Sequence, residues 1–138
     1  LNNSISQIFS DLGELEFRKI KNKVLNEILN YKYQFILSLG GGTPCYYDNM
    51  NLILSKCKNT FYLKVPLNIL SKRLFLKREK RPIISNINSL SKMNEFVAKH
   101  IFERLQYYEK SNFVIESNRN DTNLDVSKII GILNNNSL

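Results

Sequence analysis

Three consecutive glycines after a short apolar run offer the clearest place in this sequence for holding an anion. The run 35–39 ends in Gly40, Gly41 and Gly42, which are three of the five glycines in the chain. Glycine lets the backbone approach a ligand closely and leaves its N–H groups accessible to an anion. Ligands of open α/β sheets bind at the carboxyl ends of strands. A flexible turn is the alternative, but three glycines straight after a buried strand would favour a site.

Arg104 is the most informative charged residue. It follows Val97 and Ile101 and precedes Tyr108 at the three- and four-residue steps of one helical face. An arginine on an inward face either meets an anion or suffers a heavy desolvation cost. Alternatively, its stem packs on the face while its head stays in water. The spacing alone leaves both interpretations open.

Two further arginines are weaker candidates. Arg18 lies beside Phe17 at the edge of an apolar stripe, where an arginine is commonly a solvated surface charge. Arg81 precedes Pro82 at the end of a basic run that starts at Lys77. A basic loop can close over a phosphate, as kinase lids do, although such a run is more often a solvated helix end.

Several other chemistries lack the residues they need. The ATP phosphate loop requires G-x-x-x-x-G-K-[ST], and neither Gly13 nor Gly131 provides it. Cys45 and Cys57 fit neither a disulfide framework nor metal-ligand spacing, so we expect small buried residues in a reducing cytosol and no metal site. His100 is the only histidine, and its charged neighbours indicate a structural residue on a helix surface.

Helical and short apolar segments alternate, which predicts an α/β domain with a parallel sheet. Strands are expected at 35–39, buried on both faces, at 60–65 and at 112–116. Helices are expected at 4–12, 14–30, 48–54, 66–76, 90–108 and 123–133. Gly13 should end the first of them. With no internal repeat and no linker, residues 1–138 are expected to form one domain with fewer strands than usual.

Composition narrows the function classes. The formal net charge is +8 and 43% of the residues are hydrophobic, as in an ordinary globular domain. The absence of an apolar run of about 18 residues argues against a membrane span. The basic residues are dispersed without interleaved aromatics, which disfavours nucleic-acid binding. The chain begins without methionine or a signal-peptide layout, so we expect the true N-terminus to lie upstream.

Five short motifs carry a family resemblance. They are S-I-S-Q-I-F at 4–9, G-E-L-E-F-R at 13–18, L-S-L-G-G-G at 37–42, R-P-I-I at 81–84 and R-L-Q-Y-Y at 104–108. Each is weak alone, but five in the same order and spacing are specific. Together they resemble shikimate kinase over nearly the whole chain.

The resemblance implies ATP-dependent phosphorylation of the shikimate 3-hydroxyl in chorismate and aromatic amino-acid biosynthesis. It implies ATP and Mg2+ as cofactors and a cytoplasmic monomer with no nucleic-acid or membrane partner. The implied fold is a three-layer parallel sheet of the phosphate-loop small-molecule kinase type, with its first two strands missing. The family's phosphate loop and D-x-D strand would precede Leu1, so the 138 residues alone are expected to be inactive.

The resemblance also implies roles for particular residues. Arg18 and Arg104 would hold the shikimate carboxylate, and Gly40, Gly41 and Gly42 would approach the substrate. Arg81, in a lid at 77–92, would act in catalysis by reaching the transferring phosphate. Arg73 and Arg119 would contact the adenine of ATP.

Lys21 departs from the family pattern, which has a glutamate three residues after the arginine. A glutamate there would pair with Arg18 across one helical turn, whereas lysine repels it by about a few tenths of a kcal/mol. The usual ion pair of the substrate site is therefore not expected in this chain.

Three other functions compete with this interpretation. A sugar-acid kinase of the gluconate kinase type would also use arginines for a carboxylate. A non-catalytic remnant could keep only an anion pocket. A basic nucleic-acid binder should lose affinity steeply with salt.

Overall fold

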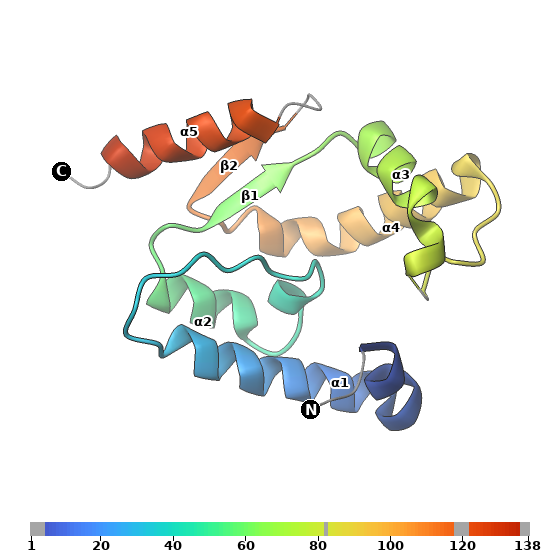
Figure 1. Ribbon diagram of the computed structural model, residues 1–138, viewed down its shortest axis with the longest axis horizontal. Coiled ribbons are helices and arrows are strands. Elements are labelled where there is room, and N and C mark those ends of the chain that lie inside the picture. The colour runs from blue at the N-terminus through green and yellow to red at the C-terminus, as the bar shows by residue number, and fades with distance from the viewer. Residues whose placement is uncertain (1–4, 82, 118–121, 136–138) are drawn as a thin grey trace. The chain divides into compact units, whose positions relative to one another are not determined.

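A computed structural model describes residues 5–81, 83–117 and 122–135 of the chain (Figure 1). The residues form two compact units, Leu1–Cys57 and Lys58–Leu138. Each unit has its own helices and its own buried residues. The expectation of a single kinase domain over 1–138 stays a prediction.

The first unit begins with helix α1, Ile5–Leu29, which is interrupted at Gly13. Gly13 has φ 75° and ψ 172°, a left-handed conformation that glycine adopts without steric cost. Residues on both sides are helical, so the predicted break at this glycine is confirmed. Helix α2, Asn49–Lys56, packs against α1, and a short 3-10 turn, η1 (Thr43–Cys45), precedes it.

The buried residues of this unit come mainly from its two helices. Leu25 of α1 is 3% exposed, and Met50 and Ile53 of α2 are each 5% exposed. Both cysteines are half-buried thiols outside any disulfide, so they are less buried than expected.

The segment 35–39 corrects one expectation from the sequence. The structure assigns no strand there, and the described residues hold two strands rather than three. Ile36 is 98% exposed and Phe35 is 41% exposed, so the segment is not buried on two faces. A strand needs a hydrogen-bonding neighbour, and no described segment forms a ladder with 35–39.

The second unit contains a parallel pair of strands, β1 (Phe61–Lys64) and β2 (Phe113–Glu116). Phe61 faces Phe113 in register, and their rings stack at 5.1 Å between centroids. At the other end the Lys64 ammonium lies 3.1 Å from the Glu116 carboxylate, and this hydrogen bond raises the pKa of Lys64. Helix α5, Thr122–Asn135, packs against β2.

Helices α3, Leu67–Leu76, and α4, Leu90–Tyr108, form the main packed core of this unit. A 3-10 turn, η2 (Arg78–Lys80), follows α3. Ile84, Met93 and Val97 are buried at 5%, 0% and 4% exposure and anchor the connection between the helices. The Ser89 side chain caps α4 by accepting a hydrogen bond from the Lys92 backbone N–H at 3.3 Å.

The parallel strands joined through helices confirm the α/β class, and α4 has the bounds predicted from its apolar spacing. No helix in the described ranges is both long and apolar enough to cross a membrane.

Candidate substrate site

Arg18 is held in place by the first unit and is not a solvated surface charge. Its side chain is 13% exposed, and one guanidinium nitrogen, Nη2, donates to Oε1 of Glu14 at 2.9 Å. The guanidinium carbon lies 3.9 Å from the centroid of the Tyr46 ring, a distance that gives a favourable cation–π contact. The buried Nε of Arg18 has no hydrogen-bond partner in the described part of the chain. The arginine therefore keeps donor capacity for a ligand.

Two of the three consecutive glycines lie directly against cationic side chains. A Cβ atom at Gly42 would stand 2.8 Å from Nη1 of Arg18 and 3.4 Å from Cε2 of Tyr46. A Cβ atom at Gly40 would stand 3.1 Å from Nζ of Lys21. A side chain at Gly42 would displace the guanidinium, so the glycine permits this close approach. The structure thus brings Arg18 together with the glycine turn, as the sequence motifs predicted.

The turn that carries the glycines is fixed by a buried asparagine. Asn49 is 2% exposed, and its Nδ2 donates to the Thr43 carbonyl at 2.7 Å. Its Oδ1 accepts from Nδ2 of Asn22 on α1 at 2.6 Å. The Thr43 backbone N–H donates to the Gly40 carbonyl at 2.7 Å. Asn49 therefore ties the turn to the helix that presents Arg18.

A hollow of about 460 Å³ opens beside Arg18. It is lined by Glu14, Leu15, Arg18, Tyr46 and Tyr47. The two tyrosines were not identified from the sequence. Their position four and five residues after Gly42 was the available signal, but only the fold shows that Tyr46 lies under the guanidinium.

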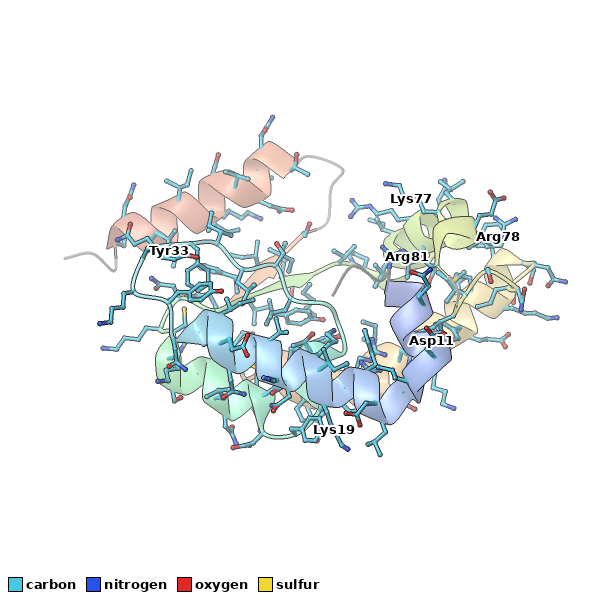
Figure 2. The ribbon with its side chains drawn as sticks, turned by 60° about the horizontal axis from the view of Figure 1, so that its bottom comes forward. Asp11, Lys19, Tyr33, Lys77, Arg78 and Arg81 are labelled. Carbon is cyan, nitrogen blue, oxygen red and sulfur yellow. The ribbon has the colours of Figure 1, made fainter. Side chains whose placement is uncertain are left out.

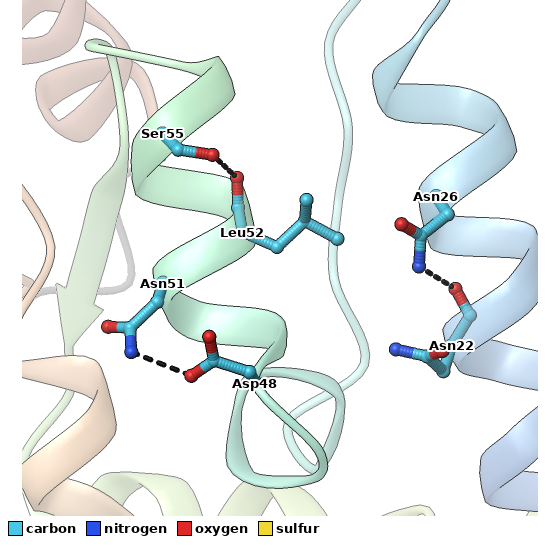
Figure 3. A pocket seen from close by; sticks show the side chains of 6 residues that line it. All are labelled: Asn22, Asn26, Asp48, Asn51, Leu52 and Ser55. Atoms are coloured by element: carbon cyan, nitrogen blue, oxygen red, sulfur yellow. Dashed lines mark hydrogen bonds between the residues drawn. The ribbon is translucent and has the colours of Figure 1, made fainter.

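A second hollow in the same unit, of about 500 Å³, lies between α1 and α2 (Figure 3). Its lining residues are Asn22, Asn26, Asp48, Asn51, Leu52 and Ser55. Many of its polar groups bond to one another, as Asn51 does to Asp48 at 2.6 Å and Asn26 does to the Asn22 carbonyl at 2.8 Å. The lining contains no arginine or lysine, whereas the hollow beside Arg18 is lined by that arginine and by its partner Glu14.

In the second unit, Arg104 lies on α4, on the same helical face as Val97 and Tyr108. Val97 on that face is buried, and Tyr108 packs against Tyr62 of β1 with ring centroids 5.2 Å apart. Arg104 itself is half-buried, and its Nη2 lies 3.4 Å from Nδ1 of His100. His100, which was expected to be structural, lies four residues before Arg104 on α4 and contacts it.

Arg78 and Arg81 differ in how their side chains are held, although both lie in the basic run after α3. Arg78 is held, because its Nη1 donates to the Phe75 carbonyl at 2.8 Å and its guanidinium lies 4.3 Å from the Phe75 ring. Arg81 is exposed at the end of η2. Figure 2 shows Lys77, Arg78 and Arg81 where α3 gives way to η2. The exposed residue of the pair is the one expected to reach a phosphate.

The remaining adenine candidates are placed only in part. Arg73 is exposed in the last turn of α3. Arg119 lies outside the described residues. Within the described ranges, no group of three or more histidine, cysteine, aspartate or glutamate side chains could hold a metal ion.

Comparisons with known proteins identify the family. A family model for shikimate kinase matches residues 1–134. The chain belongs to the shikimate kinase family. The shikimate kinase of Flavobacterium psychrophilum is 39% identical over 115 residues, which are 83% of this chain and 66% of that protein. The shikimate kinase of Flavobacterium johnsoniae is 36% identical over 132 residues, which are 96% of this chain and 76% of that protein.

A solved structure shows the same fold. The crystal structure of shikimate kinase from Bacteroides thetaiotaomicron matches with a TM-score of 0.83 at 23% identity, over 99% of this chain and 76% of that one. The predicted fold of the shikimate kinase type is confirmed, in incomplete form. The chain spans 66% of the first of these relatives and 76% of the other two.

Proposed function

We propose that this chain provides the shikimate-binding part of an enzyme that transfers phosphate from ATP to the 3-hydroxyl of shikimate. The observation that carries the proposal is the Arg18 guanidinium, held between Tyr46 and the backbone of Gly42 in a member of the shikimate kinase family. A planar guanidinium suits a carboxylate because it can donate two parallel hydrogen bonds.

The carboxylate of shikimate is bound, in this proposal, by Arg18 and Arg104. Arg18 can exchange the Glu14 contact for the ligand. Gly40, Gly41 and Gly42 supply the close backbone surface against the substrate. Arg104 offers a half-buried guanidinium whose neighbour, His100, makes only a long contact of 3.4 Å.

Phosphoryl transfer joins the 3-hydroxyl oxygen of shikimate to the γ-phosphorus of ATP, and the bond from that phosphorus to the bridging oxygen breaks to release ADP. Negative charge is spread over the γ-phosphoryl oxygens during this step. Fixed positive charge on the protein therefore contributes most of the stabilisation of the transition state. In this proposal Arg81, which is exposed in the lid at 77–92, provides this charge. Arg73 and Arg119 are proposed contacts of the adenine.

ATP phosphates require a cradle that these 138 residues do not contain, because no G-x-x-x-x-G-K-[ST] motif occurs. Mg2+ accompanies ATP in the proposal and neutralises charge on the phosphates. The described residues have no cluster suited to a metal, so none of them is assigned as its ligand.

The proposed setting is the cytoplasm, with the protein acting as a monomer on small molecules in aromatic amino-acid biosynthesis. Cys45 and Cys57 are thiols that do not form a disulfide, which fits a reducing compartment. The gluconate kinase alternative is not favoured, because the family model and the curated relatives are shikimate kinases.

A substrate panel tests the proposal. The protein as its gene encodes it is mixed with ATP and Mg2+, and ADP release is followed with shikimate, with gluconate or with no acceptor. We expect sustained ADP release with shikimate alone. Release with gluconate and none with shikimate would support the sugar-acid kinase instead, and no acceptor-dependent release would contradict a kinase function.

A further inference from the structure

Lys21 is a second cation at the glycine turn. It lies on α1 three residues after Arg18, so the two side chains share a helical face. A Cβ atom at Gly40 would stand 3.1 Å from its Nζ, as a Cβ atom at Gly42 would stand 2.8 Å from the Arg18 guanidinium. Both ends of the Gly40–Gly42 segment therefore have a positive group in close contact.

The two cations also share one aromatic ring. The Lys21 ammonium lies 5.5 Å from the centroid of the Phe17 ring, and the Arg18 guanidinium lies 5.9 Å from the same point. A ring of this kind is attractive to each cation but cannot neutralise their mutual repulsion. The Phe17 ring is thus a common neighbour of both positive groups.

The acidic partner of Arg18 lies on the same face of α1, one turn before it in the sequence. Glu14 precedes Arg18 by one turn and binds it at 2.9 Å, whereas Lys21 follows it. The charge order along this face of α1 is therefore negative, positive, positive. An anion placed over the turn would interact favourably with both cations, and a carboxylate has two oxygens that can accept from both at once.

We propose that Lys21 is a substrate-binding residue, whose ammonium donates a charged hydrogen bond to the same carboxylate that Arg18 binds over the glycine turn. The inference rests on the proposed function and adds a specificity-determining contact to it. An ammonium is a compact charge on a flexible stem, so it can follow a carboxylate without the fixed orientation that a guanidinium needs. Lys21 thereby favours the negatively charged carboxylate of the substrate over uncharged analogues.

The test compares Lys21→Met with Lys23→Met, two variants that lose the same charge from the same helix. Lys23 is exposed on α1 and serves as the matched control. Calorimetry on the gene-encoded protein measures the Kd for shikimate and for its methyl ester. We expect Lys21→Met to weaken shikimate binding about tenfold, as loss of one charged hydrogen bond would. Lys23→Met should stay within about twofold of the parent.

The ester separates a direct contact from a structural effect. Lys21→Met should leave the already weak ester binding unchanged, whereas an equal loss for acid and ester would overturn the inference. Shikimate binding by Lys21→Met at the parent's affinity would overturn it too. Lys21→Gln, which keeps a polar side chain, carries the same expectations if the methionine variant does not fold. A parent protein that binds no shikimate would contradict the proposed function itself.

Discussion

The two arginines expected to bind one carboxylate have very different surroundings in their own units. Arg18 stacks on Tyr46, binds Glu14 and lies against Gly42, with 13% of its side chain exposed. Arg104 is half-buried on α4 and has the 3.4 Å contact with His100. Arg18 therefore has more contacts that hold its guanidinium in place than Arg104 has. Ordering a long side chain costs conformational entropy, so we expect Arg18 to contribute more to affinity.

Neither arginine can replace a phosphate cradle. The largest effect that we expect is therefore the loss of kinase activity in a polypeptide without that cradle. The 138-residue polypeptide expressed alone should not phosphorylate shikimate, because positioning of the γ-phosphate is most of this chemistry. An ADP-release assay with ATP, Mg2+ and shikimate measures it. Sustained shikimate-dependent release would show that these residues hold the γ-phosphate in a way the sequence does not reveal.

Replacing each arginine tests whether Arg18 contributes more to shikimate affinity than Arg104 does. In the gene-encoded protein, Arg18→Ala and Arg104→Ala should each weaken shikimate binding by about 1.5–3 kcal/mol, since each removes a charge-assisted contact. Arg18→Ala should have the larger effect, and ATP affinity should change much less. Calorimetry measures both. Normal shikimate binding by either variant would show that its arginine is wrongly assigned, and a larger loss for Arg104→Ala would reverse the comparison.

Gly42→Ala disturbs Arg18 without removing it. The new Cβ would stand 2.8 Å from Nη1, so the guanidinium must move off the turn. We expect about a tenfold rise in the Kd for shikimate, or about 1.4 kcal/mol. Gly131→Ala is the control, because nothing described lies within 4 Å of its added Cβ in α5. It should raise helix stability by about 0.5–1 kcal/mol and leave binding unchanged. Equal binding by the two variants would mean that Arg18 needs no glycine beneath it.

The smallest effects come from the neighbours of the two arginines. Tyr46→Leu removes the ring under Arg18 and should weaken shikimate binding by about 0.5–1 kcal/mol. His100→Leu removes a long contact from Arg104 and should change binding by about 0.5 kcal/mol or less. Titration of both variants with shikimate gives their Kd values and shows which variant loses more affinity. A greater loss for His100→Leu would show that Arg104 depends on its neighbour more than Arg18 does.

Local signals predicted the helices well. The apolar spacing and the Ser89 cap define α4, and Gly13 breaks α1 at the predicted residue. The motif residues Arg18 and Gly42 were likewise predicted to share a site, and the structure places them together.

Nonlocal features were harder to predict. The segment 35–39 is apolar enough for a buried strand, but a strand also needs neighbours, and sequence does not show which ones the described chain provides. Tyr46 was missed because its contact with Arg18 depends on the path of the turn. Lys21 was expected only to repel Arg18, and the fold shows that its ammonium also lies at Gly40.

A crystal structure of the gene-encoded protein with shikimate bound tests the central claim most directly. The quantity to measure is the distance from the shikimate carboxylate oxygens to the guanidinium nitrogens of Arg18. We expect about 2.7–2.9 Å, with the carboxylate over the Gly40–Gly42 turn. A bound shikimate whose carboxylate lies away from Arg18, with its hydroxyls or another group at the turn, would contradict the assignment.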